Sequence, residues 1–445
     1  MAFFYKKMRQ EIHQTNEVFT PSKPAKKTFI ERETVREKLV RALMTPGKQI
    51  VVFGHSGVGK STLLQNKLLQ TYEHHITTRC MRGMKFDQII FDAFSQLDSY
   101  YISEKTQKNE IGFKISVEPP KLFTDIKSQF EIHRKSEGQN KLTPIIPPQL
   151  TPPTLGKLIG ESNACWVIED FHKIEDGEKH YLSQLMKVFM DLSDDYPSLK
   201  IIAIGATNTA RQVIDYDPEM KHRVSEIHVP LMTAEEIKSI VVKGEALLNI
   251  GFPELFKNLI VQHSAGMASV AHTLCLNICY SANVLETAPS SIKITKKNWD
   301  EALLSYIEES SDNIQSSFEK ALNQKRKSKF HHEKIIIQAL CDFKNGEAGR
   351  LDLLQKIQRE FPEYPNTGFK QRLEKLSLPE KGRILKFNEN SGTFSFYDPI
   401  YHAYALAHRR AIFESKENSS ISPEVTAFLE ALEELLSKNK PAEVE

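Results

Sequence analysis

The sequence predicts an α/β fold with a parallel sheet, followed by an all-helical segment and a small unit of three helices and a β-hairpin. Between residues 28 and 223, short apolar runs alternate with helical patterns, which is typical of parallel strands joined by crossover helices. From residue 224 to 324 the periodic segments have helical spacing. Beyond residue 330, three helical segments precede two alternating runs that flank an Asn-Glu-Asn-Ser-Gly turn.

The elements of the first region follow from the lengths and edges of its apolar runs. We expect strands over residues 49–53, 164–168 and 200–204, and helices over residues 33–44, 60–72, 86–101 and 179–192. The stretch 103–153 is rich in Lys, Glu, Gln and Ser and ends in several prolines, so it cannot pack a core of its own. We interpret it as an insertion, which serves either as a tolerated surface loop or as a contact element for a partner.

The helical segment begins with a clear start signal. Thr233-Ala-Glu-Glu236 is a capping box, and it predicts a helix that runs to about Leu248. Gly266 marks the end of the next helix, and two more follow over residues 268–282 and 294–311. His272, Cys275 and Cys279 share one face of a helix here, and we interpret them as core residues rather than as metal ligands.

The last region predicts a winged helix, in which three helices are followed by a two-stranded wing. The helices are expected over residues 333–343, 347–361 and 367–378, the hairpin strands over 383–388 and 393–397, and a closing helix over 400–413. Residues 422–438 form a further amphipathic helix with one apolar stripe: Val425, Phe428, Leu429, Leu432, Leu435 and Leu436. That stripe must bury against the body of the protein or against a partner.

Composition limits the class of protein. The 445 residues include 59 Lys and Arg against 57 Asp and Glu, a formal charge of +2, so there is no global basic field of the kind that announces nucleic-acid binding. The five cysteines stand in apolar contexts, which fits a reducing compartment better than a disulfide framework. The longest apolar runs are strand-sized and too short to span a bilayer, so we expect a cytoplasmic protein without membrane contact.

One motif carries the chemistry. A run of nine residues fits the Walker A pattern G-x-x-x-x-G-K-[ST]: Gly54, His55, Ser56, Gly57, Val58, Gly59, Lys60, Ser61 and Thr62. The glycines let the backbone approach a phosphate, and the amide groups and the following helix N-terminus hold the anion. Lys60 reaches the β and γ phosphates of ATP, and the Ser61 hydroxyl ligates Mg²⁺. The motif therefore predicts an ATP- and Mg²⁺-binding P-loop.

A P-loop enzyme also needs acids. Cys165-Trp-Val-Ile-Glu-Asp170 is an apolar strand that ends in two adjacent carboxylates. One should hold Mg²⁺, and the other should orient the water that attacks the γ-phosphate. By position we assign Glu169 to the metal and Asp170 to the water, but the order Glu-Asp leaves the opposite assignment open.

The next strand makes a family resemblance specific. It ends in Gly205-Ala-Thr-Asn208, which resembles the sensor 1 segment of AAA+ ATPases and implies that Asn208 contacts the γ-phosphate or the water. The segment Asp217-Pro-Glu-Met-Lys-His-Arg223 is similar to the one that carries the AAA+ arginine finger, which implies that Arg223 reaches a neighbouring subunit's nucleotide. Arg211 is the lesser candidate.

Two further comparisons with the AAA+ and STAND families concern the edges of the module. Residues 28–33 resemble the segment that opens STAND and origin-recognition-like modules, although Glu31 replaces the usual glycine. The segment Gly266-Met-Ala-Ser269 lacks the arginine that many AAA+ lids carry as sensor 2. The chain also lacks the repeat arrays and fused effectors that are usual in STAND proteins.

The expected fold is thus an α/β P-loop NTPase with an AAA+-like parallel sheet, an all-α lid and a C-terminal winged-helix domain. We expect a flexible segment over residues 1–27, the ATPase base over 28–225, the lid over 226–325, the winged helix over 330–415 and a tail helix within 416–445.

Three functions remain open at this point. The first is an ATP-hydrolysing AAA+/STAND-like switch that forms a homo-oligomer with nucleotide at the subunit interface and acts on a protein client or effector. The second is a DNA-engaging ATPase, similar to loaders, origin-recognition proteins or transposition regulators. Its DNA contacts would be Lys370, Arg372, Lys375, Lys381 and Arg383, with Lys386 adding charge at the wing. The third is a scaffold that holds nucleotide without turnover.

Overall fold

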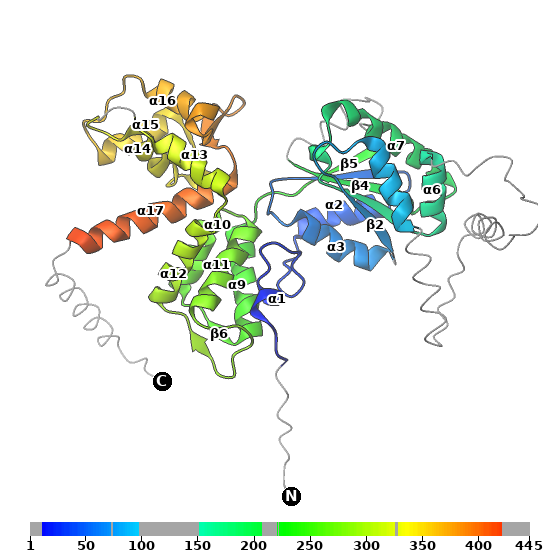
Figure 1. The fold of residues 1–445 in the computed structure, drawn as a ribbon, viewed down its shortest axis with the longest axis horizontal. Coiled ribbons are helices and arrows are strands. Elements are labelled where there is room, and N and C mark those ends of the chain that lie inside the picture. Colours follow the sequence, from blue (N-terminus) through cyan, green and yellow to red (C-terminus); the bar gives the residue numbers. More distant parts are fainter. Residues whose placement is uncertain are drawn as a thin grey trace, which may run out of the picture. The chain divides into compact units, whose positions relative to one another are not determined.

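The computed structural model describes residues 11–72, 74–97, 151–206, 220, 222–324 and 328–420, with side chains described as far as residue 409. The chain divides into two compact units (Figure 1). One unit is Ser22–Leu231, and the other combines Met1–Pro21 with Met232–Glu445.

A five-stranded parallel sheet forms the centre of the first unit. Its strands are β1 (Gln49–Phe53), β2 (His75–Arg79), β3 (Cys165–Glu169), β4 (Lys200–Gly205) and β5 (Val224–His228). They lie in the order β2-β3-β4-β1-β5, and every neighbouring pair is parallel. The expected base would end at residue 225 and cut β5, whereas the unit continues to Leu231 because β5 pairs with β1 along its whole length.

Helices cover both faces of this sheet. Successive residues of a strand point to opposite faces, and accordingly Val51 packs in one core while Ile50 and Val52 pack in another. The first core also contains residues of α6 (Pro152–Glu161) and α7 (His180–Asp191). The second contains residues of α2 (Glu33–Met44) and α3 (Lys60–Thr71). This arrangement confirms the predicted α/β P-loop NTPase fold.

The start of α6 corrects one expectation. We assigned residues 103–153 to an insertion with a proline-rich exit, and residues 103–150 lie outside the described part of the chain. Pro152 and Pro153, however, are the first residues of α6. Proline suits the first turn of a helix because its fixed φ is helical and no intrahelical partner is required for its missing N–H group.

The N-terminal segment also departs from the expectation of a flexible stretch through residue 27. Within the second unit, α1 (Thr15–Val18) and the following Phe19 are fixed against the helices, and Val18 and Phe19 are fully buried. The His13 amide donates to Oγ1 of Thr287 at 2.8 Å. The apolar pair Val18 and Phe19 thus finds a partner surface far along the chain, which composition alone could not reveal.

Four longer helices form the segment that we predicted as all-α. They are α9 (Ala234–Leu248), α10 (Glu254–Ser264), α11 (Ala268–Ser281) and α12 (Lys296–Glu308), with a two-stranded parallel pair of β6 (Ile250–Gly251) and β7 (Ile292–Lys293). The capping box is confirmed: the Glu236 amide donates to Oγ1 of Thr233, and the Thr233 amide donates to the Glu236 carboxylate. Cys275 and Cys279 are fully buried and His272 nearly so, and no group of His, Cys, Asp and Glu able to hold a metal occurs among the described residues.

The last part of the second unit has its own core. Its helices are α13 (Asp312–Leu322), α14 (His332–Leu340), α15 (Arg350–Glu360), α16 (Phe369–Leu376) and α17 (Pro399–Ser420), and its strands are β8 (Glu347–Gly349), β9 (Leu385–Asn388) and β10 (Thr393–Phe396). The strands form an antiparallel sheet in the order β8-β10-β9. The expected helix over residues 347–361 therefore begins with a strand, because Ala348 pairs with Phe394 of the hairpin. The predicted tail helix over 422–438 lies outside the described residues.

No helix in the described ranges combines the length and apolarity needed to cross a membrane.

Candidate active site

The Walker A residues form a tight loop between β1 and α3. An added Cβ at Gly54 would lie 2.4 Å from the backbone oxygen of Val229, so only glycine fits beside this segment of the backbone. Gly57 and Gly59 have φ angles of 77° and 91°, which glycine adopts without strain. Val58 is almost fully buried and anchors the loop in the core. The conformation of the loop thus depends on its three glycines, and the buried Val58 fixes its position.

Lys60 lies at the centre of this loop. Its Nζ donates hydrogen bonds to the backbone oxygens of Gly54, at 3.0 Å, and of His55, at 2.8 Å. The ammonium group is therefore folded over the loop, where the amide groups at the start of α3 also face. A bound phosphate would gain both the lysine charge and the helix N-terminus.

The two acids stand at the carboxyl end of β3, in different environments. Glu169 is the last strand residue, and its side chain is only 17% exposed and lies 3.3 Å from Nε of Arg79. Asp170 adopts a left-handed conformation with φ of 58°, and its side chain is 48% exposed and pairs with Nζ of Lys173 at 2.6 Å. The turn therefore aims the two carboxylates differently, which suits two separate roles.

Strand register brings the loop and the acids to one edge of the sheet. Phe53, the last residue of β1, pairs with Gly205 at the end of β4, while Ile168 of β3 pairs with Ala203 of the same strand. In an open parallel sheet, ligands bind outside the carboxyl ends of the strands. The sequence predicted these residues separately, and the register aligns them.

The expected sensor segment begins at the carboxyl end of β4, whose last residue is Gly205. Gly205 and Ala206 are described, whereas Asn208 and the lesser arginine candidate Arg211 lie outside the described residues. Asn208 stays a prediction from the resemblance.

Arg223 lies at the amino ends of the strands, opposite the P-loop. It directly precedes β5, its side chain is exposed, and its backbone oxygen accepts from the amide of Gln49, the first residue of β1. The five residues of β1 separate it from the P-loop, roughly 17 Å at the usual rise of a strand. Arg223 is thus remote from the P-loop of its own chain.

Sequence reasoning missed two residues near the acids. Arg79 escaped because β2 was not predicted: the strand is short and alternates between half-buried and buried positions at the sheet edge. His172 follows Asp170 in a 3₁₀ turn, and its buried Nδ1 has no hydrogen-bond partner among the described residues. Burial lowers the pKa of His172, the Asp170 charge opposes this, and Lys173 and Lys60 lower it further.

Solved structures of ATPases share this fold. The Walker-type ATPase paby2304 of Pyrococcus abyssi matches with a TM-score of 0.51 and 16% identity, over 86% of this chain and 97% of that one. The chain has the fold of a Walker-type ATPase. Cdc6p of Pyrobaculum aerophilum (TM-score 0.42, 15% identity, 90% of this chain and 98% of that chain) and the ORC1 protein of Aeropyrum pernix, solved in complex with DNA (0.41, 12%, 91% and 98%), are also similar. No protein-family model and no curated sequence matches.

Within this ATPase fold, the donor atoms at the carboxyl edge fit a magnesium ion. Ser61 offers a hydroxyl on the first turn of α3, and Glu169 offers a carboxylate that the strand holds in a mostly covered position. Hydroxyl and carboxylate oxygens are the ligands that Mg²⁺ accepts from proteins, with water and phosphate filling the rest of its shell.

Proposed function

We propose that this protein binds ATP and hydrolyses it at the carboxyl edge of the β2-β3-β4-β1-β5 sheet. The observation that carries the proposal is the placement of Lys60 over the P-loop at the same edge as Glu169 and Asp170. Residues 54–62 would hold the triphosphate, and Ser61 with Glu169 would hold Mg²⁺, which neutralises charge on the phosphates when bound. Asp170 would orient the attacking water, and Asn208 would contact the γ-phosphate or this water, as the AAA+ resemblance implies.

Phosphate release from ATP tests this proposal. Lys60→Ala is expected to abolish ATP binding and turnover together, because the lysine supplies charge to both the ground state and the transition state. Lys85→Ala is the matched control, since Lys85 is an exposed lysine of the same unit outside the Walker A residues 54–62. Turnover that survives in Lys60→Ala, or an equal loss in Lys85→Ala, would contradict the assignment.

The exposed position of Arg223 supports a homo-oligomer in which this residue acts on the nucleotide of a neighbour. The site would then be completed only in the assembly, and ATP would favour assembly. Mixing Lys60→Ala chains with Arg223→Ala chains tests this directly. Each variant is expected to be inactive alone, and a mixture should regain part of the turnover, because some interfaces join an intact P-loop to an intact arginine.

We further propose DNA as the macromolecule that the ATPase engages, in preference to a protein client. The last core of the second unit contains α14, α15, α16 and the hairpin of β9 and β10, which are the elements we expect of a winged helix. On α16, Phe369, Leu373 and Leu376 face the core, and Lys370 and Lys375 are exposed on the outer side. A helix that enters a groove needs such a basic outer face to displace counterions and contact phosphates.

Contacts within the protein limit how many basic residues face outward. Lys370 lies 3.6 Å from the Glu374 carboxylate, and Arg383 stacks over the Tyr397 ring at 4.7 Å. Lys381 donates to the Asn323 oxygen at 2.9 Å, and Arg372 to the Thr367 oxygen at 2.9 Å. Lys375 on α16 and Lys386 on the hairpin add to this charge. The surface supports a moderate number of phosphate contacts, fewer than the sequence alone suggested.

Salt-dependent binding to duplex DNA tests the second proposal. The triple change Lys370→Glu, Arg372→Glu and Lys375→Glu should weaken binding at least tenfold and flatten the slope of log K against log salt by about 2–3. The control is Lys293→Glu, Lys296→Glu and Lys297→Glu, which alters the same charge at another exposed part of the unit. Binding that is insensitive to the first change would return the protein-client hypothesis to first place.

A further inference from the structure

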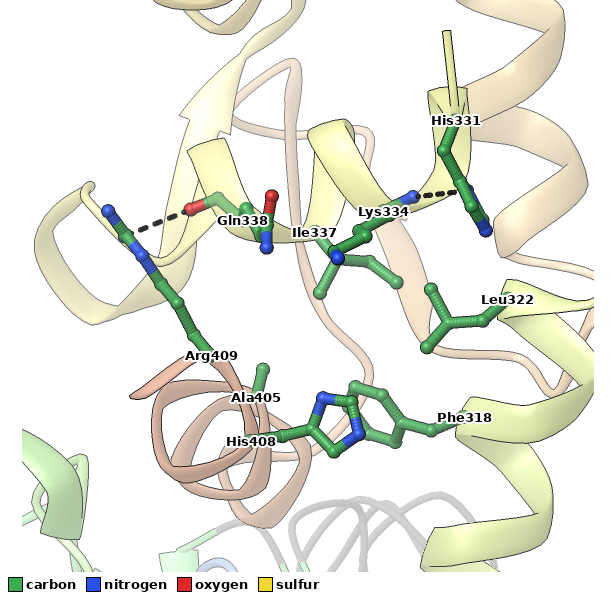
Figure 2. Close-up of a pocket in the computed structure, with 9 residues that line it drawn as sticks. All are labelled: Phe318, Leu322, His331, Lys334, Ile337, Gln338, Ala405, His408 and Arg409. Atoms are coloured by element: carbon green, nitrogen blue, oxygen red, sulfur yellow. Dashed lines mark hydrogen bonds between the residues drawn. The ribbon is translucent and has the colours of Figure 1, made fainter. Parts of the chain in front are cut away.

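A pocket of about 240 Å³ lies within the second unit between α13, α14 and α17. Its interior is apolar: Phe318, Ile337 and Ala405 are each at most 5% exposed, and Leu322 is half-buried beside them. Figure 2 shows Phe318, Leu322 and Ile337 pointing toward one space between the helices. Neither the proposed ATP site nor the DNA surface uses this pocket.

The rim of the pocket is basic. Lys334 and His331 come from α14 and the residue before it, and His408 and Arg409 come from α17. Arg409 donates to the Gln338 oxygen at 3.3 Å and to Oδ1 of Asp342 at 2.5 Å, which fixes the guanidinium at the edge of the opening. An occupant with an apolar stripe and flanking carboxylates would match both the interior and the rim.

We propose that this pocket receives the chain's own segment 422–438, laid back along α17 as an amphipathic helix. The sequence gives this segment an apolar stripe of six residues that requires a covering surface. The segment begins two residues after α17 ends at Ser420, so it is tethered to one wall of the pocket. A short tether keeps its effective concentration high.

The lengths of the two helices agree with this placement. From His408 to Ser420, α17 advances about 18 Å at 1.5 Å per residue. A helix that starts at Pro423 and returns antiparallel covers about the same 18 Å by Leu435. Leu432, Leu435 and Leu436 therefore come level with the opening, where Phe318 and Ile337 lie.

The charges agree as well. At 3.6 residues per turn, Glu433 lies about 90° to one side of the stripe and comes level with the opening. It would face the basic rim that Lys334 and Arg409 form, while Glu430 and Glu434 remain on the outer side. A second copy's tail or another protein's helix could satisfy the same pattern, and the experiment separates these occupants.

Cysteine crosslinking in the full chain tests the proposal. The pair His408→Cys and Leu435→Cys should form a disulfide within the monomer under mild oxidation, at least tenfold more than the control pair His408→Cys and Ala427→Cys. Ala427 lies on the far side of the predicted helix, and the five native cysteines are buried and should not compete. Equal crosslinking of both pairs, none in either, or bonds formed only between two copies would overturn it.

The Tm of variants without added cysteines tests the same docking independently, in case a cysteine pair disturbs the fold. Leu432→Asp with Leu435→Asp should lower the Tm of the full chain by roughly 3 °C or more, because the stripe leaves the pocket. Ala427→Asp with Ser437→Asp adds the same charge on the far side and should leave the Tm unchanged. An equal Tm for the two double variants would count against docking.

Discussion

Arg79 and Glu169 pair across the edge of the sheet, with Nε of the arginine 3.3 Å from Oε2 of the glutamate. The two residues are register partners at the carboxyl ends of β2 and β3. Their exposure differs, since the Arg79 side chain is 77% exposed and the Glu169 side chain 17%. A pair with one partner in solvent stabilises a fold by less than about 1 kcal/mol. The pair therefore matters mainly because Arg79 places a positive charge beside Glu169, the proposed magnesium ligand.

Replacing Arg79 should strengthen the binding of Mg²⁺. The arginine competes with the metal for the Glu169 carboxylate, so Arg79→Ala is expected to lower the Mg²⁺ concentration for half-maximal ATP turnover by roughly two- to fivefold. Arg79→Lys keeps the charge and should behave like the parent protein. A metal titration of phosphate release checks both variants. An unchanged or higher Mg²⁺ requirement in Arg79→Ala would contradict competition between the arginine and the metal.

Asp170→Asn should separate binding from hydrolysis. Asparagine tolerates the left-handed conformation that Asp170 adopts, so the turn should persist while the negative charge is lost. We expect ATP affinity within about threefold of the parent and turnover at least about 100-fold lower, the usual effect of removing a catalytic acid or base. Nucleotide titration and phosphate release on one preparation measure both. Normal turnover in Asp170→Asn together with loss of turnover in Glu169→Gln would mean that Glu169 orients the water and Asp170 holds the metal.

Replacing Gly54 and replacing Gly59 by alanine should lower the free energy of unfolding by different amounts. Gly54→Ala places a Cβ 2.4 Å from the Val229 backbone oxygen, so the strands must shift, and we expect a loss of about 2 kcal/mol or more in the free energy of unfolding. A Cβ at Gly59 meets nothing within 4 Å, and only its positive φ is strained, at about 1 kcal/mol. Denaturant unfolding of the two variants compares them. Equal stabilities would show that the loop approaches Val229 less closely.

The packing of the N-terminal segment should depend on pH through His272. The Thr20 amide donates to Nδ1 of His272 at 3.0 Å, so this nitrogen must be unprotonated, and burial lowers the pKa of the ring from 6.5 to about 4. Because the folded pKa is depressed, the stabilisation is full above pH 6.5 and is lost as the pH falls toward 4, by about 3 kcal/mol. Denaturant midpoints across this range measure it. His272→Gln keeps an acceptor without the titration and should show a flatter profile.

Local sequence sufficed wherever one contiguous run contains the whole requirement. The P-loop of residues 54–62 is such a case, because its glycines, lysine and hydroxyl act through adjacent backbone groups. The capping box at Thr233 and Glu236 is another, since both hydrogen bonds close within one helical turn. Helix α2 was predicted with its observed bounds for the same reason.

Other features needed partners that only the folded chain supplies. Strand β2 has too few apolar residues to be predicted, and it forms because β3 offers an open edge. Residues 347–349 continue a helical pattern, yet they pair with the hairpin strand β10. Val18 and Phe19 stand in a polar stretch and become buried on helices more than 200 positions away.

The sequence by itself determined that this protein has a P-loop, two acids after an apolar strand and an α/β sheet to hold them, because these depend on residue type and spacing. Only the tertiary structure decided which groups meet. Strand register brought Lys60, Glu169 and the unforeseen Arg79 to one edge, and it put Arg223 at the other. Register depends on side chains from distant segments packing on both faces of the sheet at once, and no local pattern encodes that.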